Sequence, residues 1–265
     1  MRDAALRAIL VTLVAALPAL ALAGGPGGEQ SRTAGLLLAA AAGLYVLVEY
    51  GARTPALIDF RFAPPINRLR FALAALTLVA TTACVAFAGQ PGPLGATFAR
   101  FGAAMDFAFS PVRMAADIFT RASAPAPDPS VEYAAATAFC VALTCAVAFG
   151  AAIWFGPWPR LSERLNLLVN LPTSDIEDDG RGARRLTLMG AQVLATAAGS
   201  LFAMLVVGGF AVALLSPDLE ISPLALVWSA TIWAGAPGTM VLRGVALLKL
   251  AQRLRRDGDL GGRRP

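Results

Sequence analysis

The chain of 265 residues contains no histidine and only three cysteines, at positions 84, 140 and 145. Without histidine, it offers no imidazole ligand for haem, chlorophyll-type pigments or metal ions, and no imidazole for acid–base catalysis. All three cysteines lie in apolar segments and none forms a CxxC pair. We therefore interpret them as small buried apolar side chains. The sequence predicts no cofactor and no metal, and it disfavours most catalytic chemistry.

Charged residues are also scarce. They make up 15% of the chain, against roughly 25% in soluble proteins. Of the 22 basic residues 21 are arginine, and the net charge of +5 invites a nucleic-acid interpretation. However, the basic residues flank apolar segments and are not interleaved with aromatic residues in a reading motif. We predict no nucleic-acid partner, and we attribute the excess of arginine and alanine to a GC-rich bacterial genome.

Long apolar segments, in contrast, are abundant, and 57% of the residues are hydrophobic. A helix needs about 20 apolar residues to cross a membrane, so the sequence predicts an all-α, polytopic transmembrane helix bundle that forms a single domain over residues 1–265. The predicted spans cover residues 8–24, 34–50, 71–89, 133–158, 186–215 and 223–248. The first segment, which follows two arginines and ends in Ala21-Leu22-Ala23, also fits a cleaved signal peptide. Six spans, or five after cleavage, therefore remain possible.

The basic residues are distributed unevenly among the loops. The N-terminus, the loops after the second and fourth spans, and the C-terminal tail hold 18 of the 22. Because cytoplasmic loops are enriched in arginine and lysine, this distribution predicts a bacterial inner-membrane protein with both termini in the cytoplasm. Cleavage of the first span would instead leave the N-terminus in the periplasm.

Two segments outside the spans carry a recognisable pattern. Apolar residues recur at helical spacing in the outer segment 90–130, which predicts an amphipathic interfacial segment. It is either a connector packed on the bundle or a partner-docking face formed by Phe98, Phe101, Met105 and Phe109. The acidic residues 175–179 match the start of a calcium loop, but Leu186 occupies the position of the bidentate glutamate. A solvated acidic turn is therefore favoured there.

The spans contain almost no ionisable residues, which argues against proton-coupled transport. Glu49 and Arg243 lie near span ends and are candidate charges at the inner leaflet. Uncharged polar residues form stripes at four-residue spacing, which either bond helices together or line a polar path. The stripe residues are Gln192, Thr196 and Ser200 on the fifth span and Thr77 and Thr81 on the third.

The sixth span contains Trp233 and Pro237, with Gly235 and Gly238 close by. Such residues either kink a membrane helix or break it, and broken helices form substrate sites in transporters. The path, if present, would lie beside this span.

Three functional hypotheses follow. The lack of catalytic chemistry and the many small residues favour a non-enzymatic protein that acts by association, as an accessory, scaffold or assembly subunit. Its partners would be the lipid bilayer and another membrane protein or a second copy of itself. The alternative is a small-molecule transporter or channel. The third, an enzyme acting on lipid, predicts that Glu49 clusters with Asp59 or arginines in a pocket at the inner leaflet.

Overall fold

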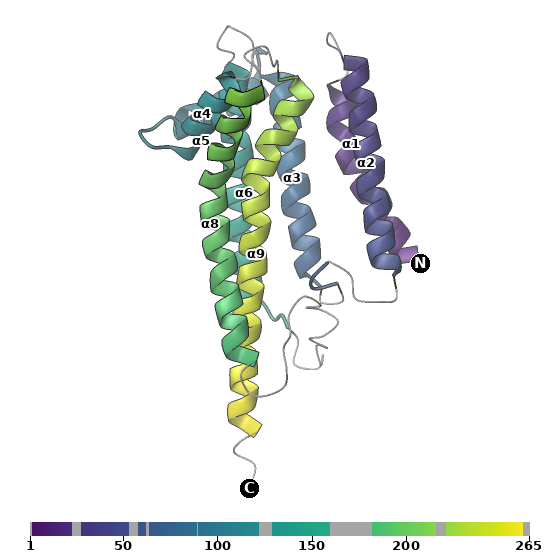
Figure 1. The fold of residues 1–265 in the computed structure, drawn as a ribbon, viewed down its shortest axis with the longest axis vertical. Coiled ribbons are helices and arrows are strands. Elements are labelled where there is room, and N and C mark those ends of the chain that lie inside the picture. The colour runs from purple at the N-terminus through teal and green to yellow at the C-terminus, as the bar shows by residue number, and fades with distance from the viewer. Residues whose placement is uncertain are drawn as a thin grey trace.

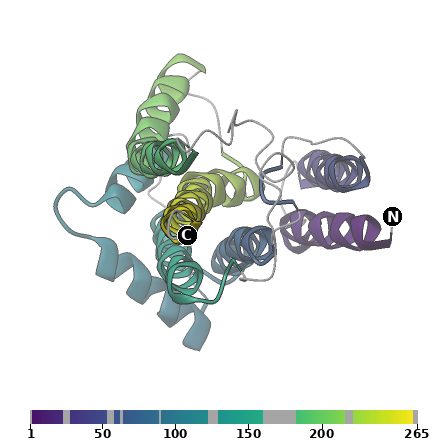
Figure 2. The ribbon, with the colours of Figure 1, turned by 90° about the horizontal axis from the view of Figure 1, so that it is seen from below.

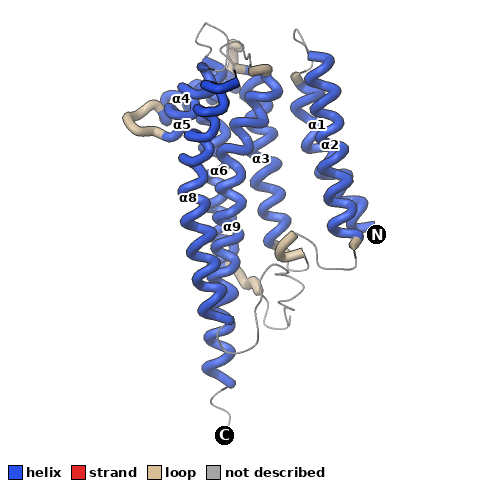
Figure 3. Tube along the Cα trace, viewed as in Figure 1, coloured by secondary structure: helices blue, strands red, loops and turns tan. Residues whose placement is uncertain are grey.

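The computed structural model of the protein describes residues 2–22, 28–52, 58–61, 64–88, 90–121, 129–159, 182–215 and 221–261, and every regular element in these ranges is a helix (Figure 3). Two short helices, α4 (Pro93–Met105) and α5 (Pro111–Arg121), lie between α3 and α6 in the chain. Six helices are long and apolar enough to cross a membrane, and each contains most of one of the six predicted apolar segments. They are α1 (Arg2–Ala21), α2 (Gly28–Gly51), α3 (Ile66–Phe87), α6 (Pro129–Phe155), α8 (Gly182–Leu215) and α9 (Pro223–Gly261).

Several helices extend beyond the apolar runs that predicted them. Helix α3 begins at Ile66 instead of residue 71, and α9 continues to Gly261 instead of ending at residue 248. Apolar runs mark the part of a helix that hydrocarbon would surround, whereas the backbone hydrogen bonds favour helix in the adjoining polar residues as well. Helix α9 also runs without interruption through Pro237. The helix is therefore not broken at this residue.

Helix α9 occupies the centre of the main bundle, where it packs against α3, α6 and α8. Helices α1 and α2 form a hairpin to one side, and α1 joins this hairpin to α3 (Figures 1 and 2). Helices α4 and α5 run across the bundle axis beside α6, in the segment where an amphipathic helix is predicted (Figure 2). The start of α1 lies near the level at which α3 begins, whereas α9 continues well beyond that level before it ends (Figure 1).

Small residues bring α8 and α9 into close contact. A Cβ atom added to Gly190 would lie 2.8 Å from Leu248 Cγ, and one added to Gly244 would lie 2.7 Å from Leu194 Cγ. Both distances are shorter than a carbon–carbon contact allows, so a larger residue at either position would force the neighbouring leucine to shift. Close approach at small residues is how helices associate where lipid tails compete for apolar surface.

Candidate functional site at the basic end of the bundle

The candidate site lies where α2 finishes and α1 and α3 begin, beside the turn of α9 that carries Arg243. We call this the basic end, because its described residues include Arg7, Arg61, Arg68, Arg70, Arg243, Lys249, Arg253, Arg255 and Arg256. The loop between α2 and α3 enters the protein here. Its Phe60 is buried and packs edge-on against Trp158, with ring centroids 6.0 Å apart. This anchor places Asp59 and Arg61, on either side of Phe60, in the interior.

Asp59 is the centre of a polar network that joins three helices. Its carboxylate Oδ2 lies 2.6 Å from Arg243 of α9, and its side chain is only 7% exposed. The amide of Asn67 donates to the carbonyl oxygen of Asp59 at 2.8 Å and to the hydroxyl of Tyr50 at 3.2 Å. Arg70 donates to Asn67 Oδ1 at 3.3 Å. The loop is thereby bonded to α3 and α9 together, with Tyr50 of α2 attached to the same amide.

The electrostatics of Asp59 reflect its burial. Burial raises the pKa of the Asp59 carboxyl, and the neighbouring Arg243 and Arg70 guanidiniums offset part of that rise. Its second oxygen, Oδ1, is buried and accepts no hydrogen bond from the described residues. The ion pair with Arg243 therefore compensates incompletely for the loss of water.

Tyr50 links the α1–α2 hairpin to this network. The guanidinium of Arg7 lies over the Tyr50 ring, 4.4 Å from its centroid, and that of Arg61 lies 5.8 Å away. Arg61 also donates to the carbonyl oxygens of Tyr50 and Ala52, both at 2.7 Å. These carbonyls belong to the C-terminal end of α2, where a cation stabilises the helix.

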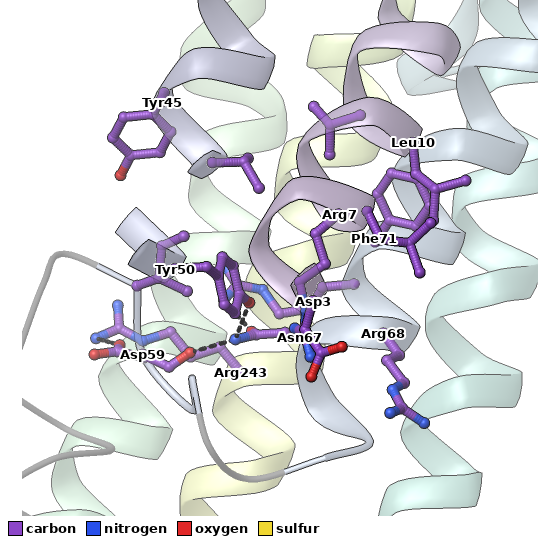
Figure 4. A pocket seen from close by; sticks show the side chains of 15 residues that line it. Asp3, Arg7, Leu10, Tyr45, Tyr50, Asp59, Asn67, Arg68, Phe71 and Arg243 are labelled. Atoms are coloured by element: carbon purple, nitrogen blue, oxygen red, sulfur yellow. Dashed lines mark hydrogen bonds and ion pairs between the residues drawn. The ribbon is translucent and has the colours of Figure 1, made fainter. Parts of the chain in front are cut away.

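A cavity of about 990 Å³ opens beside the network, between the α1–α2 hairpin and helices α3 and α9 (Figure 4). The figure shows Asp59, Asn67 and Arg243 at one level and the apolar side chains of Leu10 and Phe71 at another. The charged lining residues are Asp3, Arg7, Asp59, Arg68, Arg70 and Arg243. The apolar lining residues are Leu6, Leu10, Val11, Val46, Ile58 and Phe71. The cavity therefore has a charged part and an apolar part, and both α1 and α3 contribute residues to each part.

The two charges predicted near the inner leaflet both lie at this end. Arg243 lines the cavity and pairs with Asp59. Glu49 is buried next to Tyr50, and its Oε2 accepts no hydrogen bond from the described residues. Glu49 is not among the cavity-lining residues. The structure thus brings Asp59 and several arginines together in one pocket, with Glu49 close in the chain but outside it.

The polar stripes of the third and fifth spans do not meet. Thr77 and Thr81 are fully buried on α3, and their hydroxyls donate within the helix, to the carbonyl oxygens of Leu73 and Thr77. Gln192 and Thr196 are exposed on the outside of α8, and Ser200 is half-buried. The two stripes therefore do not line a common space.

Trp233 and Pro237 are both buried in α9. The indole nitrogen of Trp233 donates to the carbonyl oxygen of Leu201 at 3.0 Å, and its ring stacks on Phe139 with centroids 5.9 Å apart. These contacts tie α9 to α8 and α6. Trp233 thus has a packing role and a satisfied hydrogen bond, and neither residue lines the basic-end cavity.

The four candidates for a docking face are divided by the structure. Phe98 is buried, and Phe101 and Met105 pack against the same core cluster. Phe109, in the turn between α4 and α5, is 93% exposed. The acidic segment 175–179 lies outside the described residues. Within the described residues, no group of three His, Cys, Asp or Glu side chains could hold a metal ion.

Sequence reasoning did not identify Arg7, Tyr50, Asn67 or Arg70 as members of one site. One signal was present, because Asp59 is the single acidic residue in a loop region that holds four arginines between residues 51 and 70. A lone carboxylate among arginines near a membrane boundary indicates a structured ion pair. No protein family matches this chain, and neither does any curated protein or solved structure.

Proposed function

We propose that the protein works by association within the membrane, through the outward face of α8. This helix has the smallest buried share of the six long helices, 11% of its most apolar window against 50% for α9. Its exposed residues include four small ones at a spacing of four along the helix: Ala191, Ala195, Gly199 and Ala203. Small residues on one face allow two helix backbones to approach closely. A Cβ atom at Gly199 would meet no atom within 4 Å, so this face is open.

The main support for this proposal is the side chain of Gln192. This side chain is exposed on the same face, and its amide makes no hydrogen bond with the described residues. It lies seven residues beyond the exposed Arg185, which is about 10 Å along the helix axis. An amide at that depth would face hydrocarbon, where an unsatisfied polar group costs several kcal/mol. A second helix that packs on this face and carries a polar side chain opposite Gln192 would satisfy the hydrogen bonds of this amide.

The partner that fits is a second copy of this chain. Two copies inserted in the same direction place their α8 helices parallel, on either side of a twofold axis along the membrane normal. Each Gln192 then opposes the partner subunit's Gln192, and an amide both donates and accepts a hydrogen bond. The small residues at positions 191, 195, 199 and 203 would line the closest approach.

The test is the oligomeric state of the purified protein in mild detergent and in bilayers. Gly199→Leu fills the open face and is expected to convert dimer to monomer, as is the loss of the amide in Gln192→Leu. Ala148→Leu, at an exposed small residue of α6, is the matched control and should remain dimeric. A wild-type protein that is monomeric in bilayers would refute the proposal.

The proposal includes an orientation in a bacterial inner membrane. The basic end would face the cytoplasm with both termini, and α4 and α5 would lie at the outer interface, as the distribution of arginine supports. Reporter fusions at each terminus test this. Reporter activity that places either terminus in the periplasm would overturn this orientation.

A further inference from the structure

The charges that line the basic-end cavity do not balance. Arg243 is paired with Asp59, but within the described residues no carboxylate approaches within 4.0 Å of Arg7, Arg68 or Arg70. Arg70 and Arg243 both interact electrostatically with the carboxylate of Asp59, so two guanidiniums share one carboxylate. The Nε atoms of both arginines are buried and donate no hydrogen bond to the residues that the structure describes. With four arginines against Asp3 and Asp59, the charged part of the lining carries excess positive charge, which suits an anion.

The apolar part of the lining suits a hydrocarbon chain. Leu10 and Phe71 line the cavity away from the level of Asp59 and Arg243 (Figure 4). Leu6, Leu10 and Tyr45 line it too and are 58%, 45% and 47% exposed. The cavity thus opens on the outer surface of an apolar helix hairpin, where lipid chains would lie.

The size of the cavity favours a lipid over a small anion as the ligand. Ligand pockets range over roughly 300–1,000 Å³, and this one, at about 990 Å³, is at the upper limit. An inorganic phosphate would fill only a small part of that volume and would leave the apolar part of the lining uncovered. An amphiphile with a phosphate at one end would contact both the charged part and the apolar part of the lining.

We propose that the basic-end cavity binds one anionic phospholipid, with its phosphate among Arg7, Arg68 and Arg70 and its acyl chains against Leu6, Leu10 and Phe71. Arginine forms bidentate hydrogen bonds with phosphate oxygens, which favours it over lysine in such sites. The bound lipid would bridge the α1–α2 hairpin and the main bundle, because α1 supplies one side of the site and α3 the other. The site is distinct from the association face of α8.

The first experiment measures the thermal unfolding of the full-length protein in neutral detergent with added lipid. Dioleoyl phosphatidylglycerol should raise the unfolding temperature, whereas dioleoyl phosphatidylcholine and inorganic phosphate at equal concentrations should not, because ligands that bind only the folded state stabilise it. Equal stabilisation by inorganic phosphate would overturn the assignment of a lipid. The absence of any difference between the two lipids would overturn the anionic site.

The second experiment uses a matched pair of arginine substitutions. Arg68→Gln removes an exposed cavity-lining guanidinium, and Arg256→Gln removes an exposed guanidinium of the same end that does not line the cavity. Arg68→Gln should weaken the affinity for phosphatidylglycerol by roughly tenfold, the value of one charge-assisted hydrogen bond. Arg256→Gln should retain it. Equal losses in both variants would show only a general attraction to the basic end and would refute a defined site.

A third variant tests the apolar part of the lining and does not depend on charge. Leu10→Gln keeps a similar side-chain length but removes the apolar contact with an acyl chain. Its affinity for phosphatidylglycerol should fall, and the unfolding temperature without lipid verifies that the variant still folds. An unchanged affinity would overturn the placement of the acyl chains.

Discussion

At the residue scale, single charged side chains fix how the helices end at the basic end. Lys249 of α9 donates to three carbonyl oxygens at the end of α6, those of Ile153 at 2.9 Å and of Trp154 and Gly156 at 2.6 Å each. The last carbonyls of a helix have no partner within the helix, and a cation there also complements its dipole. The only lysine of the chain therefore serves as the cap of a neighbouring helix.

Substitution of this lysine should destabilise the fold. Lys249→Gln removes the charge and leaves at most part of the hydrogen bonding, so we expect a loss of about 1–3 kcal/mol in the free energy of unfolding. Arg256→Gln, one of the exposed positions of the same helix, is the control for the change in charge. Reversible unfolding in mixed micelles measures both. Equal stabilities would show that the three bonds contribute nothing.

Asp59 should make the stability depend on pH in an unusual direction. Its pKa is raised by burial, more than Arg243 and Arg70 lower it. A carboxyl with a higher pKa in the folded state favours folding when protonated, and this contribution is lost as the pH rises through the folded-state pKa. The wild type should therefore lose stability relative to Asp59→Asn as the pH rises above about 4, the ordinary pKa of an aspartate. Unfolding temperatures of both proteins at increasing pH measure the difference, and a difference that grows in favour of the wild type would contradict it.

At the scale of elements, α8 has two faces of opposite character. One face crosses α9 so closely that a Cβ atom at Gly190 or Gly244 would displace a leucine side chain of the other helix. The other presents Leu188, Phe202, Val206 and Phe210 to the outside, each between 48% and 66% exposed. Since α8 is apolar on both faces, its composition alone does not indicate which face packs on the bundle.

Two glycines of α8 provide a matched test of these faces. Gly190→Ala places a Cβ 2.8 Å from Leu248 Cγ and 3.1 Å from the carbonyl oxygen of Gly244, whereas Gly199→Ala meets nothing within 4 Å. Both substitutions change the backbone entropy equally, so their difference reports packing. We expect Gly190→Ala to be less stable than Gly199→Ala by about 1–3 kcal/mol, the usual cost of overpacking. Unfolding of the monomeric species in detergent measures this, and equal stabilities would contradict the observed crossing.

At the scale of the whole molecule, the helices form a main bundle and a side hairpin (Figure 1). The cavity lies between them at the basic end. Helix α1 packs on α2 and α3 and supplies Asp3, Leu6, Arg7, Leu10 and Val11 to the cavity. A cavity completed by α1 requires that this helix stays in the mature protein.

We therefore expect the mature protein to retain α1. The intact mass of the protein purified from native membranes should include residues 1–23, with or without the initiating methionine. A mature N-terminus at Gly24 would remove five lining residues, and the phospholipid site would then be lost with them.

The sequence by itself determined that the fold is helical with six long apolar helices, because the hydrocarbon thickness requires long apolar runs whatever the helices contact. It also placed Arg243 and Glu49 near one end, where the structure has them. Only the tertiary structure decided the rest. Spans that are apolar all round carry no signal of which face turns inward, so the outward position of Gln192 and the inward position of Thr77 had to come from packing. The pairing of Asp59 with Arg243 joins a loop to a distant helix, and it depends on how α9 crosses α3.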